Sequence, residues 1–268
     1  MKFSSRAERI DPFYVMEVAK AAQAMAREVA GTSEPMIFLN IGEPDFTAPP
    51  LVQEAAAKAV RDGATQYTNA LGMDALRERI SGWYQSRFGV DVPARRIVVT
   101  AGASAALHLA CLALIERGDE ILMPDPSYPC NRHFVSAAEG RAVLVPTTAA
   151  ERYQLSSDKV QAAWTDNTRG VLLASPSNPT GTSIAPAELR RIHEVVQSRG
   201  GVTMIDEIYL GLSYEEEFGH TALAIDEHII SINSFSKYFN MTGWRLGWLV
   251  VPEALVPVVE RLAQNLFI

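Results

Sequence analysis

Residues 170–205, GVLLASPSNPTGTSIAPAELRRIHEVVQSRGGVTMI, hold the alternation of elements that decides the fold. Gly170–Ala174 is a short apolar run of the kind that forms a buried strand, and Val202–Ile205 is a second one. The stretch between them predicts a helix over Pro186–Ser198. Short apolar strands joined by helices are typical of a parallel sheet that helices cover on both faces.

The same alternation extends over the rest of the chain from about residue 95 onward. We therefore predict an α/β protein with three layers, α/β/α, and a mostly parallel sheet. Further strands are predicted at residues 97–100, 120–123, 142–146, 229–233 and 246–251, and further helices at residues 103–116, 128–138, 157–164 and 252–266.

The composition excludes several classes of partner. The 268 residues are 48% hydrophobic and carry a net charge of -7, so a sizeable core can form, and the charge favours neither nucleic acid nor an anionic membrane. The first residues lack the apolar segment of a signal peptide, and no apolar run is long enough to span a bilayer. The two cysteines, Cys111 and Cys130, form no C-x-x-C pair that would indicate zinc. We therefore expect a cytoplasmic protein without a metal site.

Polar or glycine-rich clusters follow five of the predicted strands. In open α/β sheets, ligands bind beyond the carboxyl ends of the strands, so these clusters should converge on one site. They are Ala101–Ser104, Pro124–Tyr128, Ser175–Gly181, Asp206–Tyr209 and Ser234–Lys237.

Lys237 lies in the cluster that follows the predicted strand at residues 229–233, and aromatic residues flank it, among them Phe235 and Phe239. Desolvation lowers the pKa of a lysine and makes its neutral amine available. A neutral amine can form a Schiff base with a carbonyl compound. The alternative is an ordinary surface lysine, which the polar residues around it disfavour.

Ser234, Ser236 and Arg245 surround this lysine in the sequence. Two hydroxyls and a guanidinium can hold a phosphate group, the guanidinium through a pair of charge-assisted hydrogen bonds. Gly102–Ser104 opens a predicted helix, whose free N–H groups form a further anion site. The chain contains neither G-x-x-x-x-G-K-[ST] nor G-x-G-x-x-G, so a single phosphate is favoured over a nucleotide.

Four other side chains suit a ring that carries a pyridine nitrogen and a phenolate oxygen. A carboxylate at Asp206 needs a cationic partner, which a protonated pyridine nitrogen would supply. Tyr209 and Asn178 could donate to the phenolate oxygen, and Tyr128 offers a flat face for stacking. Taken singly, these residues could instead be a helix cap, a turn residue or part of the core. Together with the lysine and the phosphate groups, they indicate pyridoxal 5′-phosphate (PLP).

With these residues assembled, the chain resembles the class I/II aminotransferases of the aspartate aminotransferase superfamily, which have the large domain of fold type I PLP enzymes. The resemblance implies a PLP-dependent aminotransferase of amino acid metabolism that moves an amino group from an L-amino acid to a 2-oxo acid in two half-reactions. Seven motifs carry it in the family's order: Asn40–Asp45, Tyr67–Thr68 with Gly72, Thr100–Ser104, Pro126–Tyr128, Ser177–Gly181, Asp206–Tyr209, and Ser234–Lys237 through Gly243–Arg245.

The resemblance also implies a role for each site residue. Lys237 would carry the Schiff base and then move the proton, while Asp206 would keep the pyridine nitrogen protonated. Gly42 would approach the substrate carboxylate through its backbone, with Asn178 beside it. Tyr67 would reach the phosphate of the neighbouring subunit in a homodimer. The other implied cofactor contacts are Gly102, Ala103, Ser104, Tyr128, Asn178, Tyr209, Ser234, Ser236 and Arg245.

Chains of this family continue past the equivalent of residue 268. The resemblance therefore implies that most of a small C-terminal domain, with the arginine that binds the substrate carboxylate, is missing here. We expect residues 1–45 to form an N-terminal arm and part of the small domain, and residues 46–268 to form the PLP-binding large domain.

Three other interpretations compete with an aminotransferase. The first is a PLP-dependent C–S lyase or synthase of the same fold, and the second is an inactive fragment. The third is the effector domain of a transcription regulator, which is disfavoured because only about forty residues precede Asn40 and they are not basic. The sequence leaves aspartate, alanine, aromatic and branched-chain amino donors open.

Overall fold

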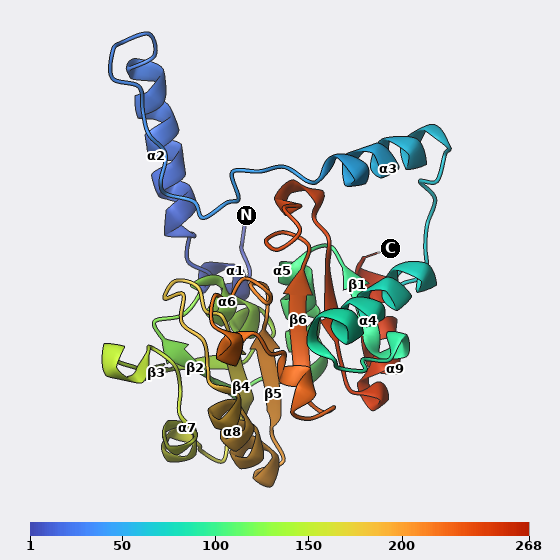
Figure 1. Ribbon diagram of the computed structural model, residues 1–268. Coiled ribbons are helices and arrows are strands. Elements are labelled where there is room, and N and C mark those ends of the chain that lie inside the picture. The colour runs from blue at the N-terminus through green and yellow to red at the C-terminus, as the bar shows by residue number, and fades with distance from the viewer. Residues whose placement is uncertain (268) are drawn as a thin grey trace.

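The computed structural model describes residues 1–267. Its strands are β1 (Ile97–Thr100), β2 (Glu120–Asp125), β3 (Arg141–Pro146), β4 (Thr168–Ala174), β5 (Val202–Asp206), β6 (Ile230–Ser234) and β7 (Gly247–Val250). Each begins and ends within two residues of its predicted bounds. Within the described residues they form one seven-stranded sheet in the order β1–β7–β6–β5–β4–β2–β3 (Figure 1).

The sheet is parallel except at one strand. Parallel pairs join β2 to β3 and β4, β4 to β5, and β5 to β6. Strand β7 runs antiparallel to both of its neighbours, β1 and β6. Because β1 and β6 are both antiparallel to β7, they run in the same direction. The carboxyl ends of β1 to β6 therefore meet at one edge of the sheet, as the polar clusters predicted.

Helices cover both faces of the sheet, so the predicted three-layer α/β/α fold is confirmed (Figure 1). On one face, the apolar side of α5 packs on the sheet through residues such as Leu109, which shares a core with Leu172 and Met204. The opposite face carries two further clusters, centred on Ile192 and on Tyr84. The first face is covered by α5 (Ala103–Leu114), α6 (Cys130–Ala137) and α9 (Val256–Leu266), and the second by α4 (Asp74–Phe88), α7 (Ser157–Ala163) and α8 (Pro186–Ser198).

The predicted helices agree with these elements apart from their ends. Helix α8 has its predicted bounds, whereas α5 ends two residues early, at Leu114. Helix α6 begins at Cys130 rather than at Tyr128, because a residue that precedes proline, here Pro129, is kept out of the helical conformation. Helix α9 begins only at Val256, after a short 3₁₀ turn.

The sequence patterns did not predict α4, nor the three helices ahead of it: α1 (Ser5–Glu8), α2 (Tyr14–Glu28) and α3 (Pro50–Arg61). Helix α3 contains no buried residue, and α2 buries only Ala19 and Ala22. Figure 1 shows α2 and α3 extending beyond the edge at which β6 ends. This N-terminal region therefore adds little to the core.

Short 3₁₀ turns complete the described secondary structure, at Ala94–Arg96, Ala149–Glu151, Glu216–Phe218, Ala222–Ala224, Thr242–Trp244 and Glu253–Leu255. None of the helices within residues 1–267 combines the length and the apolar character needed to cross a membrane.

Candidate active site

A cavity of about 360 Å³ lies at the carboxyl edge of the sheet. Seven chain segments meet there: the beginning of α2, residues 40–42, the start of α5, and the loops that follow β2, β4, β5 and β6. Eight residues predicted from the sequence line it: Gly42, Ala103, Ser104, Tyr128, Asn178, Asp206, Tyr209 and Lys237. The predicted convergence of the strand-end clusters is therefore found in the structure.

Lys237 projects into this cavity from the turn that follows β6. Its Nζ donates a hydrogen bond to the carbonyl oxygen of Gly42, 2.8 Å away. Desolvation lowers the pKa of the amine, and the nearby Glu43 opposes that shift only in part. A half-buried amine with a lowered pKa is more readily available as a nucleophile or a base than an exposed lysine.

The aromatic neighbours of Lys237 anchor its turn to the back of the sheet. The rings of Phe235 and Phe239 lie 5.1 Å apart between centroids, and Phe235 lies 4.9 Å from buried Trp248 on β7. These apolar contacts hold the backbone on both sides of the lysine while its side chain points to the opposite, polar side. The dense aromatic sequence around Lys237 thus reflects packing as well as desolvation.

Asp206 is the last residue of β5 and is 7% exposed. Its Oδ1 accepts a hydrogen bond of 3.0 Å from the backbone N–H of Ile208. Burial raises the pKa of Asp206 to about 6. Among residues 1–267 no cationic side chain forms an ion pair with it. A cationic N–H group in the cavity could therefore satisfy this carboxylate and restore its charge.

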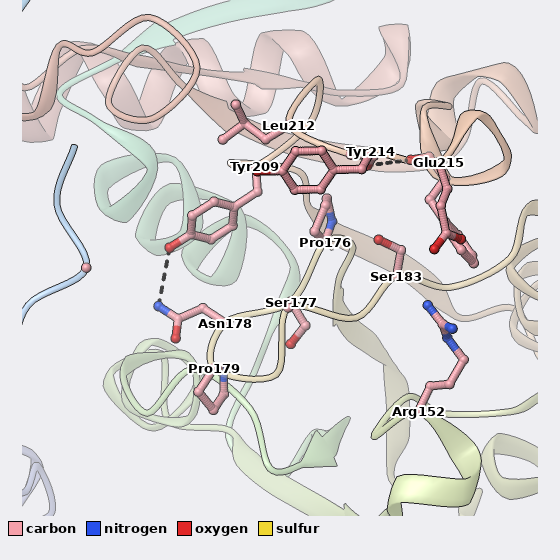
Figure 2. Close-up of a pocket in the computed structure, with 14 residues that line it drawn as sticks. Arg152, Pro176, Ser177, Asn178, Pro179, Ser183, Tyr209, Leu212, Tyr214 and Glu215 are labelled. Carbon is pink, nitrogen blue, oxygen red and sulfur yellow. Dashed lines mark hydrogen bonds between the residues drawn. The ribbon is translucent and has the colours of Figure 1, made fainter. Parts of the chain in front are cut away.

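Asn178, Tyr209 and Tyr128 contribute polar and flat surfaces to the same cavity. Asn178 Nδ2 lies 3.4 Å from the hydroxyl of Tyr209, so the two groups can address one oxygen atom of a ligand (Figure 2). Burial raises the pKa of both tyrosines, which keeps them protonated and able to donate. Tyr128 meets the ring of Phe13 edge to face, with 5.8 Å between centroids.

Groups that could bind an anion lie where the turn before β7 meets the first residues of α5. Gly102 is the N-cap of α5 and has a φ of 85°. Because glycine has no side chain, no N-cap side chain accepts a hydrogen bond from the first N–H groups of the helix. A Cβ at Gly102 would lie 2.4 Å from Nη2 of Arg245, which places the guanidinium against this helix end. Ser234 Oγ donates to Ser236 Oγ at 2.8 Å beside them.

The predicted residue Tyr67 does not line this cavity. It lies between α3 and α4 and is 89% exposed. Conversely, the structure adds Phe13, Val15 and Met16 at the beginning of α2, which the sequence analysis missed. Apolar residues on a terminal helix carry no signal that links them to a distant site, so only the tertiary structure shows this contact.

A second cavity, of about 470 Å³, adjoins the first and shares Asn178 and Tyr209 with it (Figure 2). Arg152 lines its far side and stacks on the ring of Phe218, with 4.7 Å from the guanidinium carbon to the ring centroid. Glu215 lines the same side. The loop that carries Asn178 is thus accessible from two directions.

Comparison with known proteins gives the family. A sequence model described as "Aminotransferase class I and II" matches residues 34–268. The valine–pyruvate aminotransferase of Mycobacterium tuberculosis is 38% identical over 257 residues, which are 96% of this chain and 65% of the relative. The aspartate aminotransferase of Pyrococcus horikoshii is 33% identical over 236 residues, 88% of this chain and 60% of the relative.

Solved structures show the same similarity. The crystal structure of an aminotransferase from Mycobacterium tuberculosis matches with a TM-score of 0.93 and 38% identity, covering 100% of this chain and 68% of its own. The aspartate aminotransferase from Thermus thermophilus with maleate matches with a TM-score of 0.92 and 28% identity, covering 99% and 69%. The chain spans about two thirds of the length of the curated relatives that it matches.

Members of this family use PLP as their cofactor. The match extends over nearly the whole chain, the sequence relatives exceed 30% identity, and the fold matches that of solved aminotransferases. The chain therefore belongs to the class I and II aminotransferases.

Proposed function

We propose that this chain forms the PLP-binding large domain of an aminotransferase that transfers an amino group from an L-amino acid to a 2-oxo acid. One observation carries the proposal. A single cavity combines the Lys237 amine with its lowered pKa, the buried Asp206 carboxylate and, at its edge, an anion site at the start of α5. The names of the relatives support the same reaction class.

The residues present fit PLP. Asp206 has no cationic side chain paired with it within residues 1–267, and the cofactor's pyridine N–H would supply that partner. The end of α5 with Arg245, Ser234 and Ser236 would bind its phosphate, since a glycine at 102 leaves room for the guanidinium. Asn178 and Tyr209 would donate to its phenolate oxygen, and Tyr128 would lie against the ring.

When bound, PLP supplies an electron sink for the charge that develops at the substrate Cα. The chain's own residues do the rest. Lys237 Nζ would hold the cofactor covalently and, once the substrate amine has displaced it, would take the proton from the substrate Cα. The lowered pKa of Lys237 makes its unprotonated amine easier to reach for that step than that of an exposed lysine. Gly42 would leave room for the substrate carboxylate close to the backbone, with Asn178 beside it.

The active assembly is proposed to be a homodimer. Tyr67 is exposed and lies outside its own chain's cavity, so it is free to reach the site of a second copy. Apolar side chains of the N-terminal region are exposed as well, including Ile37, Leu39 and Phe46. Exposed apolar groups of this kind are typical of protein interfaces.

The test is an absorbance titration of the protein with PLP, before and after L-amino acids are added. A visible band that forms with the wild type and shifts to the pyridoxamine form with an amino acid supports an aminotransferase. If the band forms but the added amino acid is cleaved, and no pyridoxamine form appears, the protein is a lyase. Lys237→Ala should lose the PLP adduct that borohydride traps, whereas the control Lys20→Ala, at an exposed lysine of α2, should retain it. A trapped adduct in Lys237→Ala would refute the assignment of the lysine.

A further inference from the structure

Asp206 and Glu207 are consecutive residues, yet their side chains lie on opposite faces of the sheet, as expected for an extended chain. Asp206 lines the proposed cofactor cavity. Glu207 is 1% exposed and bonds to groups on the back face, among them Ser231 of β6. No step of the proposed reaction uses Glu207.

The Glu207 carboxylate accepts three hydrogen bonds. The donors are the hydroxyl of Thr221 at 2.9 Å, the backbone N–H of Ala222 at 2.7 Å and the hydroxyl of Ser231 at 2.6 Å. Thr221 and Ala222 lie between β5 and β6, and Ser231 lies on β6 itself. One side chain therefore joins three separate parts of the chain.

This arrangement is costly for a purely structural group. Within residues 1–267 no lysine or arginine forms an ion pair with Glu207, and burial raises its pKa to about 7. An apolar side chain of similar volume could fill the same space without the desolvation of a carboxylate. The three hydrogen bonds are directional, whereas apolar packing is not, so they can fix the backbone at Glu207 more tightly.

The backbone at Glu207 belongs to the turn that presents the site residues. Its N–H donates to Ile232 O of β6 at 2.8 Å, and its carbonyl accepts from Leu210 N–H at 2.8 Å. Asp206 precedes it and bonds to Ile208, and Tyr209 follows two residues later. Any rotation of the turn would therefore move the carboxylate of Asp206 and the hydroxyl of Tyr209 together.

We propose that Glu207 is a positioning residue for the cofactor site, holding Asp206 and Tyr209 in place through its hydrogen bonds to Thr221, Ala222 and Ser231 on the back of the sheet. The inference rests on the proposed function, because it assumes that Asp206 faces PLP. It assigns to the carboxyl group of Glu207 a part in cofactor affinity, although the group does not touch the cavity.

The test compares two replacements of nearly equal size. In Glu207→Gln, the amide oxygen can accept from Ala222, and the hydroxyls of Thr221 and Ser231 can turn to accept from the amide nitrogen. In Glu207→Met, all three bonds are lost. The dissociation constant for PLP is measured by absorbance titration, and the unfolding temperature is measured without PLP. We expect the PLP dissociation constant of Glu207→Gln to stay within about twofold of the wild-type value. Glu207→Met should bind PLP about tenfold more weakly, a loss that corresponds to one buried hydrogen bond.

A second measurement separates positioning from general destabilisation. If Glu207 acts through Asp206, Glu207→Met should weaken PLP binding far less in an Asp206→Asn background than in the wild type. An equal loss of affinity in both backgrounds would overturn the inference. A matched control is Thr203→Val, which removes the hydrogen bond of 2.9 Å between Thr203 Oγ1 and His193 Nδ1 on the same face. It should lower stability and leave the PLP dissociation constant unchanged.

The outcomes distinguish the two proposals. A wild-type protein that binds no PLP would overturn the proposed function and this inference with it. A wild type that binds PLP, with Glu207→Met binding equally well, would overturn only the inference. If Glu207→Met does not fold, Ser231→Ala removes a single bond from the carboxylate and should still weaken PLP binding several-fold; an unchanged dissociation constant would contradict the role.

Discussion

The carboxyl edge of the sheet and the N-terminal region depart from the usual distribution of residues in opposite ways. At the edge, polar side chains are buried: Asp206 is 7%, Ser234 1% and Ser236 7% exposed. In the N-terminal region, apolar side chains are exposed: Leu39 is 90% and Phe46 76% exposed. Each departure raises the free energy of the isolated chain.

The two departures point to different partners. A buried carboxylate without a paired cation, in the same cavity as a lysine with a lowered pKa, is stabilised when a ligand with complementary charges enters the cavity. An exposed apolar surface is stabilised when another protein surface covers it. The edge therefore indicates a small-molecule site, and residues 37–46 indicate a contact surface.

The largest expected effect lies at the edge. Asp206→Asn should still bind PLP through the phosphate groups, but it should slow the conversion of bound cofactor by an amino acid at least ~100-fold, because the carboxylate no longer stabilises the cationic ring nitrogen. Single-turnover absorbance measurements at saturating amino acid would give the rate. The matched control is Asp125→Asn, at the exposed end of β2. A near-normal rate in Asp206→Asn would remove Asp206 from the chemistry.

The second prediction contrasts the core with the N-terminal region. Leu172 in the middle of β4 is 1% exposed, so Leu172→Ala should lower the free energy of unfolding by about 2–5 kcal/mol. Phe38 is 50% exposed, and Phe38→Ala should change the free energy of unfolding by less than about 0.5 kcal/mol. Urea unfolding curves of both variants would provide the two values. A large loss for Phe38→Ala that depends on protein concentration would show that a second copy covers this residue.

A pH dependence follows from the two buried acids. In the folded chain, burial raises the pKa of Asp206 from 3.8 to about 6 and that of Glu207 from 4.5 to about 7. Between about pH 4 and 7 the folded protein thus binds more protons than the unfolded one, so the stability contributed by these groups falls as pH rises. The fall is on the order of 3 kcal/mol for each group.

Unfolding measured without cofactor at pH 5 and pH 8 tests this sign. Other carboxylates have lowered pKa values and oppose the trend, among them Glu120 and Glu188, so each variant is compared with the wild type. Glu207→Gln should gain stability relative to the wild type at pH 8 more than at pH 5. An equal difference at both pH values would contradict the raised pKa of Glu207.

The comparison also shows what the sequence can predict. Strands β1 to β7 were predicted because each is a short apolar run, and five of them are followed by a polar or glycine-rich cluster. The convergence of Asp206, Asn178 and Lys237 followed from one rule, that parallel strands end at the same edge. Local pattern and global fold agree in this part of the chain.

Other features have no local signal. The start of α2, with Phe13 and Met16, lines the cavity although nothing in its sequence refers to a site more than a hundred residues away. The hydrogen bonds of Glu207 were not predicted, because in the sequence it is simply the residue after Asp206 in one motif. Only the structure shows that its carboxylate faces Thr221 and Ser231. Both depend on contacts between distant segments.

The smallest expected effect concerns a link between the two regions. Arg6 and Arg9 at α1 form ion pairs with Glu139, in the turn after α6, at 2.9 and 3.4 Å. Arg117 pairs with Glu139 as well, at 3.3 Å. The three arginine side chains are exposed and Glu139 is half-buried, so these are surface ion pairs and Glu139→Gln should leave the unfolding temperature within experimental error. The substitution should release α1 from the turn, so trypsin should cleave the first residues faster. High salt screens the same ion pairs and should have the same effect on the wild type. The control is Glu8→Gln, which removes an exposed carboxylate of α1. Trypsin should cleave this variant at the wild-type rate. If Glu139→Gln instead lowered the unfolding temperature by several degrees, the N-terminal region would contribute to the stability of the sheet domain, and the contrast between the two regions would have to be abandoned.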